Sequence, residues 1–180
     1  MKTSEQGLSL IEANEAYRGV PYKDVAGYWT WGYGHKRADN EPIPTYISQS
    51  NAIALLRADI VPVEASINAS VTVPLTQNQF DALADFVFNV GVAAFESSTL
   101  LRELNSNNYQ TAADQLLIWD KAHVNGQIVV VPGLLSRRQH ERMLFVTGDP
   151  VTTKPVVVPT PQPSAWEGFV DSVKSLFGIK

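Results

Sequence analysis

The sequence predicts a mainly helical α+β domain, with a small β-hairpin or meander near the N-terminus, a long linking helix and a helical remainder. The stretch from Tyr22 to Tyr33 combines turn-forming residues with aromatic, β-prone ones. From Ser48 onward, apolar residues recur at spacings of three and four, which is typical of helices buried on one side. At 180 residues, the chain is long enough for one domain with a core and a short appendage.

Composition excludes several function classes. The formal net charge of −4 argues against a nucleic-acid binder. The absence of Cys excludes disulfides, thiolate nucleophiles and Cys-ligated metals, and the three His lack the spacing of metal ligands. No stretch reads as a signal peptide or a membrane span, which predicts synthesis in the cytoplasm.

The first predicted helix carries a candidate acid. Thr3 or Ser4 can cap it, and Gly19 and Pro21 are expected to end it. Glu15 falls in line with the apolar residues of this helix, close to its C-terminus. Because burial and the negative end of the helix dipole both disfavour ionisation, Glu15 suits a proton donor.

The aromatic stretch is predicted to form strands around a bend between Asp24 and Gly27. Strict alternation would place Thr30 on one face with Tyr28 and Gly32. The opposite face would carry Trp29, Trp31 and Tyr33. We favour packing over sugar stacking for these three aromatic side chains.

The remaining elements are helical. Ser48 can begin the linking helix, in which Pro62 is expected to cause a kink. Thr76 and Gln79 form a capping box for the best candidate for the central core helix, which Gly91 ends. Shorter helices are predicted over 98–104 and 111–122, a hairpin around the Asn-Gly pair at 125–126, and a last helix over 135–145.

A change in composition predicts the domain boundaries: a catalytic domain over 1–148, a proline-rich linker over 149–163 and an amphipathic helix over 164–180. The apolar face of that last helix is formed by Trp166, Phe169, Val170, Val173, Leu176 and Phe177. Its charges balance to zero, so we expect contact with a catalytic domain, its own or that of a second copy, or weak membrane contact, with docking favoured.

Glu15, Asp24 and Thr30 form a coherent set for glycoside hydrolysis, in which one acid protonates the leaving oxygen and a second carboxylate faces the attacking water. Eight residues separate Glu15 from Asp24, and five separate Asp24 from Thr30. Spacing alone still favours two unrelated surface acids, because acidic residues are common near turns.

The same stretch, with GYGH at 32–35, resembles the active-site signature of phage-type lysozymes, the muramidase endolysins of tailed bacteriophages. Further segments resemble that family in order: LTQNQFDALADFVFNVG at 75–91, SSTLLRELN at 97–105 and PGLLSRRQHERMLF at 132–145. The resemblance covers about 7–147. It implies a two-lobed lysozyme-like fold around a cleft, with the lobes joined by the long helix.

The resemblance also implies site residues and a reaction. Glu15 would be the general acid, Asp24 the second catalytic carboxylate and Thr30 the third member. The substrate would be peptidoglycan, cleaved without a metal or a cofactor at the β-1,4 bond between N-acetylmuramic acid and N-acetylglucosamine, for lysis of the host cell. We expect an inverting reaction with widely separated carboxyl groups. A holin-type membrane pore is implied as the partner that gives access to the wall in the periplasm.

Alternatives remain at this point. The domain could be a non-catalytic peptidoglycan-binding module of lysozyme-like fold. Either Arg137 or Arg138 could reach Glu15, with the remaining arginines in solvent or paired with Glu141. For His35 we expect a hydrogen bond to a nearby carboxylate.

Overall fold

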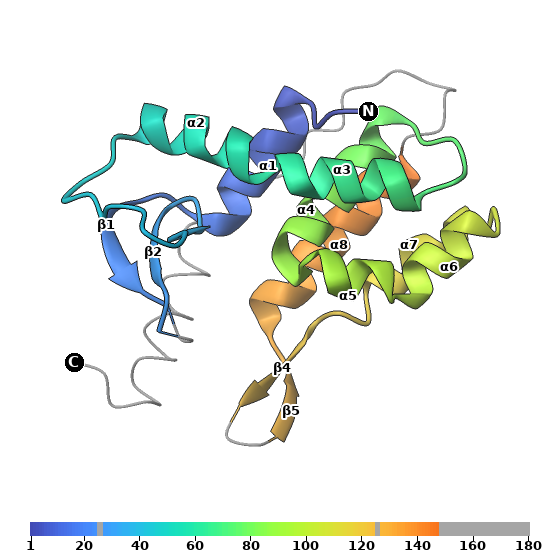
Figure 1. The fold of residues 1–180 in the computed structure, drawn as a ribbon. Helices are drawn as coiled ribbons and strands as arrows, with labels where there is room; N and C mark the ends of the chain where they lie inside the picture. Colours follow the sequence, from blue (N-terminus) through green and yellow to red (C-terminus); the bar gives the residue numbers. More distant parts are fainter. Residues whose placement is uncertain (25–26, 125–126, 148–180) are drawn as a thin grey trace.

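The computed structural model describes residues 1–24, 27–124 and 127–147 (Figure 1). A small sheet lies at one end of the molecule, and a cluster of helices lies at the other. This is the predicted arrangement of a mainly helical chain with small antiparallel sheets. The predicted linker, the predicted tail helix and the Asn-Gly pair at 125–126 lie outside the described residues.

The first helix, α1, spans Glu5–Glu15. Ser4 caps it, because its hydroxyl oxygen accepts a hydrogen bond from the backbone N–H of Gly7. The helix ends where Ala16 adopts a φ of 53° and a ψ of 137°, which are not helical values. The prediction that Gly19 and Pro21 end the helix is therefore wrong, since both lie within the strand that follows.

Three short strands form an antiparallel sheet in the order β1 (Arg18–Lys23), β2 (Trp29–Gly32) and β3 (His35–Lys36). The bend before β2 is confirmed, because the N–H of Gly27 donates to the carbonyl of Asp24 at 2.9 Å. Pairing between β1 and β2 is irregular near Arg18 and places Tyr22 opposite Thr30. The sheet therefore presents Tyr22 and Thr30 next to the turn that begins at Asp24.

The predicted alternation of facing along the aromatic stretch does not appear as an alternation of burial. Thr30 and Trp31 are neighbours in the sequence, yet each is only 2% exposed. Alternation of burial assumes a regular strand with one face in solvent. Strand β2 is instead a four-residue middle strand with helix α2 (Gln49–Asp59) packed against it and an irregular partner in β1. Tyr33 already belongs to the turn after β2 and is also buried.

The linking element consists of two helices, α2 (Gln49–Asp59) and α3 (Val61–Ser70), which run one after the other from the sheet to the helical lobe (Figure 1). Ser48 caps α2 as predicted. The helix is interrupted at Ile60, and Pro62 lies in the first turn of α3, where its missing N–H costs nothing. The predicted kink is thus a break between two helices. Helix α2 packs against β2 and β3, and α3 packs against α4 (Gln77–Val90) and α5 (Val92–Glu96).

The helical lobe is built around α4 (Gln77–Val90), as predicted. Thr76 and Gln79 form the full capping box, and Gly91 ends the helix with a φ of 89°. Every residue from Phe80 to Val87 is buried, because α1, α3, α5 and α8 all pack against this helix. A buried stretch this long includes two aspartates, and both need partners.

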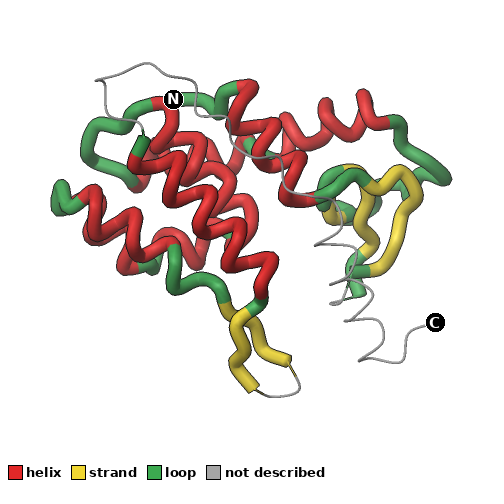
Figure 2. Tube along the Cα trace, turned by 180° about the vertical axis from the view of Figure 1, so that it is seen from behind, coloured by secondary structure: helices red, strands yellow, loops and turns green. Residues whose placement is uncertain are grey.

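The lobe is completed by α5 (Val92–Glu96), α6 (Thr99–Asn105), α7 (Tyr109–Leu116), β4 (Lys121–Val124), β5 (Gln127–Val130) and α8 (Pro132–Val146). The predicted helix over 111–122 is wrong at both ends, since α7 begins earlier and residues 121 and 122 belong to β4. The short α5 was not predicted. The hairpin β4–β5 projects from the lobe (Figure 2). Within the described ranges, no helix is long and apolar enough to cross a membrane.

Candidate active site

Glu15 is the last residue of α1, at the point where the chain passes from the helices into the sheet. Its carboxylate oxygen Oε1 accepts a hydrogen bond from Nη1 of Arg137 at 2.7 Å. The side chain of Glu15 is 20% exposed, and that of Arg137 is 7% exposed. Of the two arginines that the sequence left open, Arg137 is therefore the one that contacts Glu15. The expectation drawn from burial and the helix dipole did not include this cation.

The second oxygen of Glu15 faces the turn between β2 and β3. A Cβ atom placed on Gly34 would lie 3.3 Å from Oε2 of Glu15. Gly34 also has a φ of 80°, which side-chain-bearing residues rarely adopt. The backbone at Gly34 therefore approaches the carboxylate more closely than other residues would allow.

Asp24 and Thr30 are held by the same residue, Tyr28. The Oδ1 atom of Asp24 accepts from the backbone N–H of Tyr28 at 2.9 Å, and the hydroxyl of Thr30 donates to the carbonyl of Tyr28 at 3.2 Å. The Oδ2 atom of Asp24 lies 3.7 Å from Nζ of Lys36, and the side chain of Asp24 is 17% exposed. The structure thus brings Asp24 and Thr30 together through a short segment of backbone.

Tyr22 links these residues to Glu15 electrostatically. Burial raises the pKa of the Tyr22 hydroxyl, the Arg18 guanidinium 4.6 Å from its ring centre opposes this, and the negative charges of Glu15 and Asp24 add to the increase. Both carboxylates therefore act on one hydroxyl. Sequence reasoning missed Tyr22, because its position opposite Thr30 depends on an irregular strand register.

Arg137 is itself held by a buried carboxylate. The side chain of Asp85, on α4, is 0% exposed. Its two oxygens accept from Nη2 of Arg137 at 2.7 Å and from Nε at 3.2 Å. Burial alone would lower the pKa of Arg137, but the charges of Asp85, Glu15 and Glu141 outweigh it and raise this pKa. Arg137 therefore remains a cation.

A second buried arginine lies beside the first. Nη2 of Arg138 donates to Oε1 of Glu141 at 2.8 Å and to Asn89 at 2.9 Å. Within the described part of the chain, Nε and Nη1 of Arg138 and Oε2 of Glu141 have no hydrogen-bond partner. Burial raises the pKa of Glu141 and Asp85 adds to this, whereas the two arginines act in the opposite direction.

His35 is bound by two carboxylates, which confirms the predicted role. Its Nδ1 lies 2.8 Å from Asp59, and its Nε2 lies 3.0 Å from Glu41. Its ring packs beside that of Trp31, with ring centres 5.0 Å apart. Because Trp31 and Tyr33 are both buried, packing is confirmed as their role.

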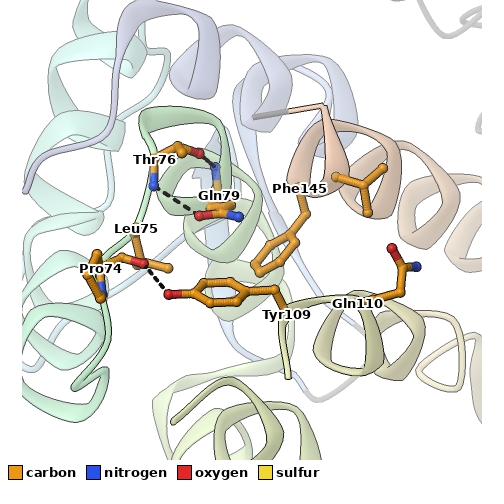
Figure 3. Close-up of a pocket in the computed structure, with 8 residues that line it drawn as sticks. Pro74, Leu75, Thr76, Gln79, Tyr109, Gln110 and Phe145 are labelled. Atoms are coloured by element: carbon orange, nitrogen blue, oxygen red, sulfur yellow. Dashed lines mark hydrogen bonds between the residues drawn. The ribbon is translucent and has the colours of Figure 1, made fainter. Parts of the chain in front are cut away.

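A separate pocket lies where the start of α4, the start of α7 and the end of α8 meet (Figure 3). Its lining consists of Pro74, Leu75, Thr76, Gln79, Tyr109, Gln110, Phe145 and Val146. Glu15 does not line this pocket. It is bound by Arg137, which lies about two turns before the pocket residue Phe145 on α8. The lining of this pocket carries no acid or base for hydrolysis, so it is not the candidate active site.

The family model described as phage lysozyme matches residues 12–141. An endolysin of Acyrthosiphon pisum secondary endosymbiont phage 1 is 48% identical over 145 residues, which cover 81% of this chain and 98% of the relative. A SAR-endolysin of Escherichia phage Mu is 42% identical and covers 79% of this chain and 78% of the relative. The muramidase domain of SpmX from Asticaccaulis excentricus superimposes with a TM-score of 0.76 at 39% identity, covering 81% of this chain and 97% of that domain. The chain belongs to the phage lysozyme family.

Proposed function

We propose that Glu15, Asp24 and Thr30 carry out the reaction of this cell-wall glycoside hydrolase, the cleavage of the β-1,4 bond between N-acetylmuramic acid and N-acetylglucosamine in peptidoglycan. One observation supports the proposal most strongly. Arg137 occupies Oε1 of Glu15, while Oε2 faces the sheet that carries the other two residues. An acid with one oxygen anchored by a cation and the other held beside the sheet has a defined orientation, which suits proton transfer.

In the proposed reaction, Glu15 gives a proton to the glycosidic oxygen as the bond from that oxygen to the anomeric carbon breaks. A water molecule attacks the same carbon from the opposite face and gives a proton to Asp24. The hydroxyl proton of Thr30 is directed to the carbonyl of Tyr28, so its oxygen can accept a hydrogen bond from that water. The anomeric configuration is inverted.

Kinetics on purified peptidoglycan test these roles. Replacing Glu15 with Gln should abolish the release of reducing ends while leaving the circular dichroism spectrum and wall binding unchanged. Replacing Glu12 with Gln, one turn earlier on α1, is the matched control and should leave activity intact. NMR of the first product should show the α-anomer. An active Glu15→Gln variant would sink the acid assignment, and a β-anomeric first product would rule out inversion.

We further propose that this enzyme reaches the wall through a separate holin-type membrane pore, as the family resemblance implies. Expression of the chain in a bacterial host should then cause lysis only when such a pore is produced at the same time. Lysis by the chain alone, at equal expression levels, would contradict a need for the pore.

A further inference from the structure

Asp85 contacts both of the groups that hold Glu15 in place. Asn14, which directly precedes Glu15 on α1, donates from Nδ2 to Oδ2 of Asp85 at 2.8 Å. Arg137, which binds Glu15 through Nη1, binds both oxygens of Asp85 through Nη2 and Nε. One buried carboxylate on α4 is therefore connected to Glu15 by two routes, through the backbone of α1 and through α8.

The shape of the guanidinium group makes this arrangement specific. Arg137 has a planar, rigid fork of donors. When Nε and Nη2 are bound to Asp85, Nη1 is the nitrogen that remains to meet Glu15. Nη2 also donates to the backbone carbonyl of Asp85 at 3.2 Å, which further limits rotation of the plane. The position of Oε1 of Glu15 is thus set by the orientation of Asp85.

We propose that Asp85 is a positioning residue for catalysis, which fixes Arg137 and Asn14 so that Glu15 presents only Oε2 to the sugar. This inference rests on the proposed role of Glu15 as the general acid. A carboxylate at 0% exposure is costly to bury, and an apolar residue could pack between the same three helices at lower cost. The charge of Asp85 is explained if it orients Glu15 through Arg137, because a small misplacement of a catalytic group lowers the reaction rate strongly.

Asp85 has an electrostatic effect as well. It shares the positive charge of Arg137 with Glu15. Without that carboxylate, the charge of Arg137 would no longer be shared with a group on α4. The other charged groups that face this region are Arg138 and Glu141 on α8 and Arg18 and Asp24 across Tyr22. All of them remain when only Asp85 is changed.

The test compares Asp85→Asn with a matched control in the full chain. Asp81 lies one turn earlier on α4 and is 1% exposed. It accepts from Ser4 and Gln77, so it holds the opposite end of α1 from Glu15. Initial rates on purified peptidoglycan give kcat and KM. Asp85→Asn should lower kcat about 10- to 100-fold with little change in KM. Asp81→Asn should lower the melting temperature but keep the kcat of the parent.

Two results would overturn the inference: a parental kcat in Asp85→Asn, or the same loss of kcat at unchanged KM in Asp81→Asn. Failure of the proposed function is recognised separately, as activity in Glu15→Gln. If Asp85→Asn does not fold, Asn14→Ala removes one route and leaves the Arg137 fork in place. That variant should lower kcat, and a parental kcat would again overturn the inference.

Discussion

Arg137 and Glu15 are 122 positions apart in the sequence, and Nη1 of the first meets Oε1 of the second at 2.7 Å. The contact joins the N-terminal half of α8 to the last residue of α1. Arg137 also pairs with Asp85, so a single guanidinium balances a partly exposed carboxylate and a fully buried one. Both stability and activity should therefore depend on Arg137.

Replacing Arg137 with Ala should abolish hydrolysis of peptidoglycan, because Glu15 would lose its anchor. It should also lower the free energy of unfolding by about 3–5 kcal/mol, because Asp85 would remain buried without its charge partner. Urea unfolding checks the second value. Arg142→Ala on the same helix is the control, since the pair of Arg142 with Asp114 is largely exposed and should cost less than about 1 kcal/mol. Equal losses in the two variants would contradict this account.

Gly34→Ala should reduce activity through the Glu15 carboxylate. Its φ of 80° makes any side chain cost about 1–2 kcal/mol, and the new Cβ would lie 3.3 Å from Oε2. Gly91→Ala offers a matched comparison, with a φ of 89° and no described atom within 4 Å of its Cβ position. Both variants should melt earlier, but only Gly34→Ala should lose kcat. A parental kcat in Gly34→Ala would show that the acid tolerates displacement.

The His35 cluster should stabilise the fold in a pH-dependent way. Burial alone would lower the pKa of His35, but its hydrogen bonds to Glu41 and Asp59 outweigh burial and raise it. A folded-state pKa above that of the unfolded chain gives stability that is complete below the unfolded value of about 6.5 and is lost as pH rises through the folded value. His35→Phe keeps a ring beside Trp31 but removes both nitrogens.

The difference in unfolding free energy between the parent and His35→Phe should therefore be largest in mildly acidic solution and shrink as pH rises. The two acidic partners differ: burial would raise the pKa of Glu41 but its hydrogen bonds lower it, whereas burial raises the pKa of Asp59 despite the imidazole. The pKa of Glu41 is lowered and the pKa of His35 is raised, as expected for the two partners of an ion pair. Urea titrations at several pH values measure the difference, and one that grew with pH would refute the assignment.

Arg138 and Glu141 should behave as a coupled buried pair. Replacing Arg138 with Met or Glu141 with Leu alone should each cost several kcal/mol, because the remaining partner would be left buried. The double variant should recover most of that loss, since Nε and Nη1 of Arg138 and Oε2 of Glu141 lack partners among the described residues. A double-mutant cycle by thermal unfolding gives the coupling energy. Strictly additive losses would exclude coupling.

Truncation after Pro150 tests the predicted domain boundary. The shortened chain should keep its activity on isolated peptidoglycan, because all the candidate site residues precede the boundary. A lowered melting temperature would indicate that the tail docks on the domain, and a loss confined to whole cells would indicate an envelope role. Loss of activity on isolated peptidoglycan would contradict the boundary.

Local signals made several features predictable from the sequence. The Thr76–Gln79 capping box and the Gly91 helix end depend on residues within a few positions of each other. The choice between Arg137 and Arg138 was not predictable, because neighbours on a helix point about 100° apart and the rotation of α8 follows from its packing on α4. The left-handed φ of Ala16 has no sequence signal either, since Ala normally avoids that region.

In the described part of the chain, the backbone passes from the helical lobe to the sheet at Ala16 and returns at Ile60, between α2 and α3. Glu15 stands directly before the first of these crossings and is anchored to α8, whereas Asp24 and Thr30 follow it in the sheet. The relative position of the two halves at these crossings therefore sets the distance between Glu15 on one side and Asp24 and Thr30 on the other.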